Sequence, residues 1–125
     1  MAQLKNINKI FDLRAGGSIT VGNNRTITRE NRATFTGCLH GHPVFKIVCD
    51  MSGESGDCRV TLNTCGYMTV TMRSAMNDFC SAFGVSVGVS FAKGVFSARY
   101  NGKDITHNGY GIIVIQAQRY AGESK

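Results

Sequence analysis

The sequence predicts an α+β fold, with a mainly antiparallel sheet, one central amphipathic helix packed on it and a short N-terminal helix. Apolar residues between positions 72 and 83 recur with a helical period, whereas the runs on either side alternate with a period of two. The connections between these runs are too short for parallel crossovers, so the strands must pair antiparallel. The 125 residues, of which 42% are hydrophobic, suffice for a single domain with its own core.

The first 32 residues are expected to form a basic helix and arm. Apolar residues in 4–14 are spaced by three and four, which predicts a short helix that ends at Gly16-Gly17. Residues 18–22 and 26–29 follow as a loose hairpin with weak alternation. We therefore expect residues 1–32 to form an N-terminal arm and residues 33–125 a compact α+β domain, within one domain overall.

The remaining elements follow from periodicity and turn residues. The helix carries its apolar stripe from Met72 to Phe83, with Thr69 or Thr71 as its N-cap and Gly84 at its C-terminal end. Asn101-Gly102 is typical of a type I′ hairpin turn. The predicted strands are 33–40, 44–50, 58–63, 85–90, 95–100, 104–107 and 111–118, with a polar loop at 51–57.

The charge distribution points to an anionic partner. The formal net charge is +6, with +4 in residues 1–32, −1 in residues 33–66 and +3 in residues 67–125. If the two ends of the chain meet, they form a basic face that attracts phosphate backbones; otherwise the surface is simply basic and soluble. The cationic candidates for this face are Arg25, Arg29, Arg32, Arg73, Lys93, Arg99 and Lys103.

The start of the central helix is the most specific candidate site. Helix N-termini expose unpaired amides and favour anions, and the hydroxyls of Thr69 and Thr71 flank this one. Arg73 and Asn77 are four residues apart and share a helical face, while Tyr67 could stack on a base. The alternative interpretation is that the threonines only cap the helix and Tyr67 covers the core.

Three other patterns concern RNA binding, metal binding and catalysis. Residues 91–103 interleave aromatic and basic side chains, but their phase differs from an RNA-recognition motif and directs Phe96 inward. Cys38, His40 and His42 alternate as metal ligands could, yet the chain has no C-x₂-C pair, so we assign no metal and favour buried thiols. No catalytic motif is recognisable, and we expect neither enzymatic activity nor a cofactor.

Residues 60–77 read VTLNTCGYMTVTMRSAMN. This segment resembles a motif of small uncharacterised bacteriophage proteins, roughly T-L-N-S-x-G-W-x-T-x-T-T-K-x-R-M-N. The resemblance covers about residues 38–103 and implies a phage or mobile-element origin and an α+β domain, but no activity. The chain departs from the motif at Tyr67, where the family has Trp, and at Ala75, the second basic position of the motif.

These observations lead to the hypothesis of a non-enzymatic phage accessory protein that acts by binding in the host cytoplasm. Nucleic acid is the first expected partner. The alternative is a counter-defence inhibitor, similar in action to anti-CRISPR proteins, that binds and blocks a host protein. A third hypothesis is a binder of small nucleotides or anions. No apolar run reaches the roughly 18 residues of a membrane span, so we expect no membrane contact. Open strand edges are compatible with a homodimer.

Overall fold

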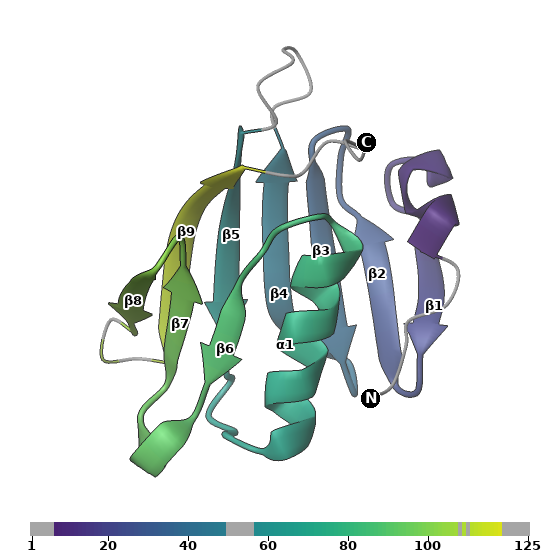
Figure 1. The fold of residues 1–125 in the computed structure, drawn as a ribbon. Coiled ribbons are helices and arrows are strands. Elements are labelled where there is room, and N and C mark those ends of the chain that lie inside the picture. The colour runs from purple at the N-terminus through teal and green to yellow at the C-terminus, as the bar shows by residue number, and fades with distance from the viewer. Residues whose placement is uncertain (1–6, 50–56, 108, 110, 119–125) are drawn as a thin grey trace.

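The computed structural model describes residues 7–49, 57–107, 109 and 111–118, and these form two layers. One layer is a six-stranded antiparallel sheet of order β1-β2-β3-β4-β5-β9. The other consists of the helix α1 and a three-stranded sheet β6-β7-β8, which lie on the same face of the large sheet (Figure 1). The predicted α+β class, with a mainly antiparallel sheet and one helix packed on it, is confirmed.

The elements follow the predicted order. The strands are β1 (Ser18–Gly22), β2 (Arg25–Arg29), β3 (Thr34–Leu39), β4 (His42–Cys49), β5 (Asp57–Asn63), β6 (Gly88–Ser90), β7 (Ser97–Tyr100), β8 (Lys103–Thr106) and β9 (Ile112–Gln118). The helices are η1 (Ile7–Asp12), α1 (Val70–Ala82) and η2 (Ala92–Gly94). Asn101 and Gly102 both have positive φ angles, as the predicted type I′ turn requires. Most of the predicted 51–57 loop lies outside the described residues.

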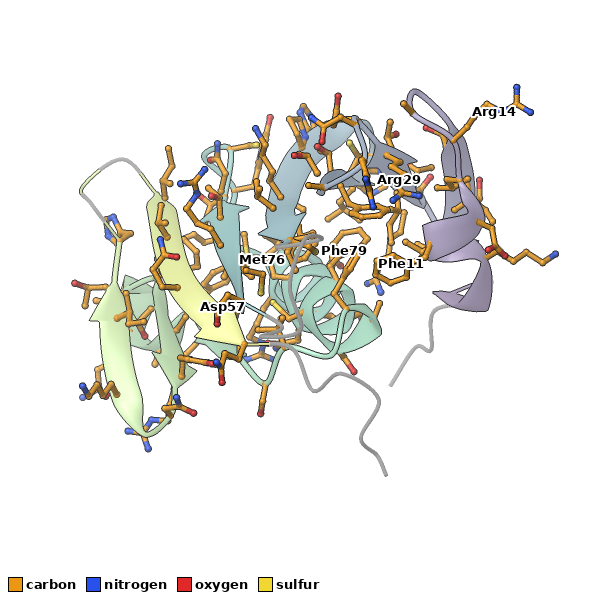
Figure 2. All side chains as sticks on the ribbon, turned by 90° about the horizontal axis from the view of Figure 1, so that it is seen from above. Phe11, Arg14, Arg29, Asp57, Met76 and Phe79 are labelled. Atoms are coloured by element: carbon orange, nitrogen blue, oxygen red, sulfur yellow. The ribbon has the colours of Figure 1, made fainter. Side chains whose placement is uncertain are left out.

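The helix α1 forms where the apolar stripe predicts it. The hydroxyl of Thr69 accepts a hydrogen bond from the amide of Met72 at 3.1 Å, so Thr69 is the N-cap of the two candidates. At the other end Gly84 adopts a φ of 73°, which glycine allows without strain. Met76 and Phe79 point from α1 toward the large sheet (Figure 2) and are fully buried.

A cluster of phenylalanine rings joins α1 to the sheet. The ring centroid of Phe45 lies 5.5 Å from those of both Phe79 and Phe83 in stacked geometry, and Phe35 lies 5.1 Å from Phe83. Gly37 lies under the Phe79 ring, so close that a Cβ at this position would be 3.0 Å from three ring atoms. Gly37 therefore sets how closely α1 approaches β3.

The N-terminal third differs from the predicted helix and arm. Its helix is a six-residue 3₁₀ helix over Ile7–Asp12, and the predicted start at residues 4–6 lies outside the described residues. The hairpin of β1 and β2 continues the large sheet through the pairing of β2 with β3. Val21 and Ile27 are fully buried, so the core extends across residue 32 without a break.

The strands β6, β7 and β8 form a separate small sheet, although the sequence predicts that the strands after the helix complete the same sheet. Only Gly88–Ser90 of the predicted 85–90 strand pairs, with β7, while Val85 lies buried outside any strand. The last strand, β9, leaves β8 and pairs with β5 over seven residues. Apolar and polar residues alternate along β9, so its pairing with β5 buries every second side chain against the core, whereas β8 is mostly exposed.

No helix among the described residues has the length and apolar character needed to cross a bilayer.

Replacing Gly37 with alanine should lower the free energy of unfolding by about 1–3 kcal/mol, because the added methyl group meets the buried Phe79 ring. Denaturant titration of the variant measures this change. Gly88→Ala is the matched control, since a Cβ there meets nothing within 4 Å, and it should change the free energy by less than about 0.5 kcal/mol. Equal effects of the two substitutions would contradict this account of helix packing.

Candidate functional site

Two grooves flank the start of α1 and share the rim residue Thr69. We call the first the Phe91 groove; it is lined by Met68, Thr69, Val70, Arg73, Ser90, Phe91 and Ala92. We call the second the Tyr67 groove; it is lined by Leu39, His40, His42, Tyr67, Thr69, Thr71 and Met72. None of these described lining residues is acidic. The start of the helix thus lies between two concave surfaces without negative side chains.

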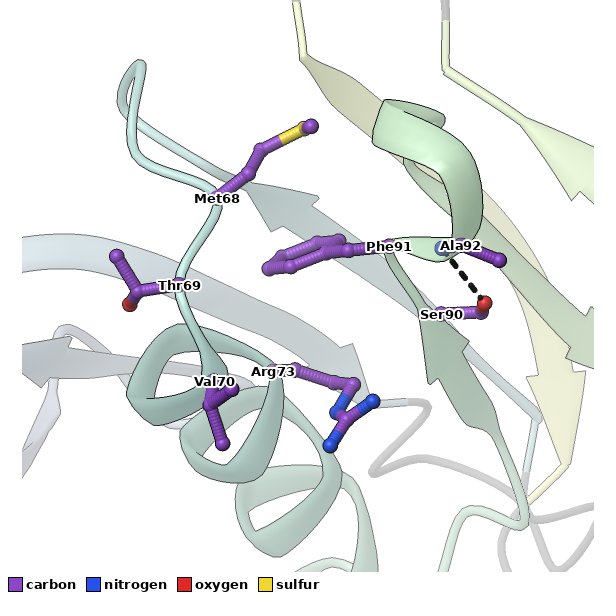
Figure 3. A pocket seen from close by; sticks show the side chains of 7 residues that line it. All are labelled: Met68, Thr69, Val70, Arg73, Ser90, Phe91 and Ala92. Carbon is purple, nitrogen blue, oxygen red and sulfur yellow. Dashed lines mark hydrogen bonds between the residues drawn. The ribbon is translucent and has the colours of Figure 1, made fainter.

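The Phe91 groove is built from α1 and the segment that follows β6. Figure 3 shows the Phe91 ring directed toward the start of α1, between Met68 and Arg73. The ring is half-buried because it also packs edge-on against Phe96, with centroids 5.4 Å apart. The Ala92 amide donates to the Ser90 hydroxyl at 3.2 Å, which orders the turn after the ring. Arg73 is exposed and forms no ion pair within the described part of the chain.

The Tyr67 groove depends on the tight turn between β5 and α1. Cys65 and Gly66 both adopt left-handed φ angles, and the amide of Tyr67 donates to the carbonyl of Thr64 at 2.9 Å. This turn holds Tyr67 outward with 53% of its surface exposed. Its ring centroid lies 5.7 Å from that of His42, at the start of β4. Tyr67 therefore lies largely in solvent beside His42 instead of covering the core.

The first turn of α1 faces the rim between the grooves. The Thr69 hydroxyl is already used by the Met72 amide, and the Thr69 carbonyl accepts from the Arg73 amide at 3.0 Å. The amides of Val70 and Thr71 belong to the first turn, where an α-helix offers no internal acceptor. The helix dipole adds partial positive charge at this end. The rim is therefore electropositive even apart from Arg73.

The segment 60–77, compared above with a phage motif, passes through this end of the molecule. Its positions Tyr67, Thr69, Thr71 and Arg73 all line one groove or the other. Ala75, where the motif has its second basic residue, is fully buried against the sheet. Arg73 is therefore the solvent-facing cation of this segment.

Two of the predicted site residues instead hold the fold together. Arg25 is only 7% exposed, and its guanidinium forms an ion pair with Asp78 of α1 at 2.5 Å. Asn77 accepts a hydrogen bond from the Val89 amide at 2.8 Å and so joins α1 to β6 rather than facing the grooves with Arg73. These contacts tie α1 to a strand on each side.

Arg29 also has a structural position. Its guanidinium donates to the carbonyl oxygens of Phe11, Leu13 and Arg32 at 3.1, 2.8 and 2.7 Å. It also lies 4.9 Å from the centroid of the Phe35 ring. Figure 2 shows Arg29 over this end of the core, whereas the neighbouring Arg14 points away. Arg29 therefore fastens the N-terminal 3₁₀ segment to the sheet.

The predicted single basic face does not form. Arg25, Arg29 and Arg32 belong to β2 and its turn, near one edge of the large sheet, whereas Lys93, Arg99 and Lys103 belong to the small-sheet segment at the other side (Figure 1). Arg99 bonds the exposed carboxylate of Asp104 at 2.9 Å, and this contact lowers the pKa of Asp104 and raises that of Arg99. The strand order thus keeps these two sets of cations apart.

The alternating Cys38, His40 and His42 do not share a face. His40 takes a left-handed φ of 52° in the turn, and a shift of register follows Gly37 in β3. His42 packs on Tyr67, whereas burial raises the pKa of the half-buried Cys38 thiol. The described residues contain no group of three or more side chains placed to hold a metal ion.

Sequence reasoning missed the apolar part of the site. Met68 and Val70 are 43% and 72% exposed. Both precede the apolar stripe of α1, and two apolar residues outside the stripe are a signal in the sequence that could have indicated an exposed apolar surface. Phe91 and His42 reach the grooves only through tertiary packing. As predicted, Phe96 lies in the core.

Comparison of the chain with protein-family models, with curated proteins and with solved structures gave no match.

Asp78→Ala should lower the free energy of unfolding by about 3–5 kcal/mol, because it leaves the Arg25 charge buried without a partner. Asp104→Ala removes the exposed partner of Arg99 and should leave the denaturation midpoint close to that of the parent protein. Urea titrations of both variants provide the comparison. A small effect of Asp78→Ala would mean that Arg25 reaches solvent and remains a candidate for binding.

Proposed function

We propose that the protein is a non-enzymatic binding protein that contacts single-stranded nucleic acid across the start of α1. The observation that carries the proposal is that the two grooves meet at Thr69 and each contains an aromatic side chain. A strand that crosses Thr69 can place one base on Tyr67 and the next on Phe91. Stacking on aromatic side chains contributes about 1–3 kcal/mol per base and tolerates any base.

The charges around the grooves suit the phosphate that joins two such bases. Arg73 lies beside the Phe91 ring, and Lys93 is exposed one residue beyond Ala92. The first-turn amides and the dipole of α1 favour an anion at the rim between the grooves. The net charge of +6 draws a polyanion toward the molecule over a longer range.

A single strand fits these features better than a duplex. In a duplex the base faces are stacked on each other, so Tyr67 and Phe91 could contact only edges and backbone. Proteins that read unpaired nucleic acid use exposed aromatic rings together with cations. The proposal includes a bacteriophage origin and a location in the host cytoplasm, both of which rest on the resemblance of residues 60–77.

A protein partner is the second candidate for the same surface. Met68 and Val70 are exposed apolar side chains without an aromatic ring, and exposed apolar groups of this kind are typical of protein contacts. This observation favours the counter-defence alternative, in which the start of α1 blocks a host protein. A single nucleotide held in the Phe91 groove is the third candidate, and it would contact Arg73 and the Phe91 ring.

Binding of fluorescein-labelled 12-nucleotide DNA and RNA, measured by anisotropy at several salt concentrations, tests the main proposal. Tyr67→Ala and Phe91→Leu should each weaken binding roughly 5- to 150-fold, as expected for loss of one stacked base. Arg73→Ala should also lower the slope of log affinity against log salt by about one.

Arg59→Ala is the matched charge control, because Arg59 is exposed on β5 and lines neither groove. It should weaken binding less than Arg73→Ala. Equal losses for the two arginine variants would indicate non-specific attraction rather than a site. Absence of binding at low salt, or stronger binding of a duplex than of its single strands, would refute the proposal.

Capture from nuclease-treated host lysate tests the protein alternative. Val70→Asp should abolish retention of a specific host protein if the start of α1 is its docking surface. Val114→Asp is the matched control, since Val114 is also exposed, at 49%, but lies on β9. Retention by both variants would place any protein contact elsewhere on the molecule.

A further inference from the structure

Two cysteines face each other across neighbouring strands of the large sheet. Cys49 at the end of β4 pairs directly with Cys58 of β5, and both side chains are thiols that form no disulfide and are 5% exposed. The Cys49 amide donates to the carbonyl of Ala33, on the β3 side, at 2.8 Å. The amide and the carbonyl of one strand residue point to the same side, so both groups of Cys49 face β3 and neither faces β5. Cys49 and Cys58 therefore form a non-hydrogen-bonded pair.

This pairing brings the two thiols within reach of a disulfide. Residues in a non-hydrogen-bonded antiparallel pair have Cα atoms about 4.5 Å apart, the closer of the two kinds of pair. Disulfides span Cα separations of roughly 4.4–6.8 Å. Directly opposed residues of neighbouring strands point to the same face of the sheet, and both cysteines are buried there.

We infer that Cys49 and Cys58 form an oxidisable dithiol, which a low-molecular-weight disulfide such as oxidised glutathione converts to a cross-strand disulfide. The site is independent of the proposed function, because Cys49 ends β4, the Tyr67 groove lies where β4 begins at His42, and neither cysteine lines either groove.

The reaction balances by two successive exchanges. The thiolate of one cysteine attacks the glutathione disulfide, forms a mixed disulfide and releases one glutathione thiolate, which takes up a proton. The thiolate of the second cysteine then attacks the protein sulfur of the mixed disulfide and displaces a second glutathione. Both protein thiols lose a proton, the pair is oxidised by two electrons, and one glutathione disulfide is reduced to two thiols.

The other three cysteines are placed less favourably. Cys80 of α1 interacts with Cys58, but burial raises its pKa to about 12, so it supplies almost no thiolate near neutral pH. Cys38 and Cys65 lie at the other end of the sheet around Pro43, whose carbonyl accepts a hydrogen bond from the Cys65 thiol at 3.6 Å. Cys38 and Cys65 are not paired across strands, so no register holds them in position for a bond.

The test uses the full-length protein incubated with oxidised glutathione in native buffer, followed by thiol blocking and digestion with trypsin without reductant. Trypsin cleaves after Lys46 and Arg59, so Cys49 and Cys58 fall in one peptide, residues 47–59, that contains no other cysteine. We expect this peptide to lose two hydrogens and carry no blocking group. The peptides with Cys38, Cys65 and Cys80 should carry blocking groups or glutathione.

Thermal unfolding gives a second readout. The bond closes a short loop and restricts the unfolded chain, so the oxidised protein should melt higher by on the order of 10 °C. Cys58→Ser should abolish both the mass loss and the shift, whereas the control Cys65→Ser should retain them. The inference is overturned if residues 47–59 keep two free thiols, stop at glutathione adducts, or if Cys58 is joined to Cys80 instead.

Discussion

The close approach of α1 to the large sheet at Gly37 is the constraint on which the rest of the structure depends. With no side chain on Gly37, the Phe79 ring rests on the backbone of β3, and Phe45 stacks on Phe79 and Phe83 at 5.5 Å. The buried Arg25–Asp78 ion pair fixes the same helix to β2 from the side. A bulkier residue at position 37 would lift the helix and disturb all of these contacts together.

Because the body of α1 is fixed, its first turn is fixed as well, and the grooves follow from that position. The Tyr67 groove forms between the helix and the turn that joins β3 to β4, and the Phe91 groove forms between the helix and the segment after β6. Two other parts of the chain thus frame one helix terminus. A site held by buried packing loses little conformational entropy when it binds, which favours affinity.

Local patterns allowed much of this architecture to be predicted. The stripe from Met72 to Phe83 predicts α1, and Asn101-Gly102 predicts the β7–β8 turn. Tyr67, Thr69 and Arg73 are neighbours in the chain, so their convergence at the helix start is also predictable. Strand periodicity predicts which side chains share a face but not which strands pair. The separate small sheet and the pairing of β9 with β5 could therefore not be predicted from it. Phe91 directly follows β6, so its place beside α1 depends on the small sheet, which periodicity did not predict.

The arginines show which additional rule separates structural cations from those available to a ligand. Arg25, Ile27 and Arg29 alternate on β2, so both arginines share the face of a buried isoleucine and are drawn toward the core. Their charges are then satisfied by a carboxylate or by carbonyl oxygens, and their stems contribute to packing. Arg73 lies out of phase with the apolar stripe of α1 and faces solvent beside Phe91. Phase relative to the core, rather than the local density of positive charge, therefore identifies the cation that a ligand can reach.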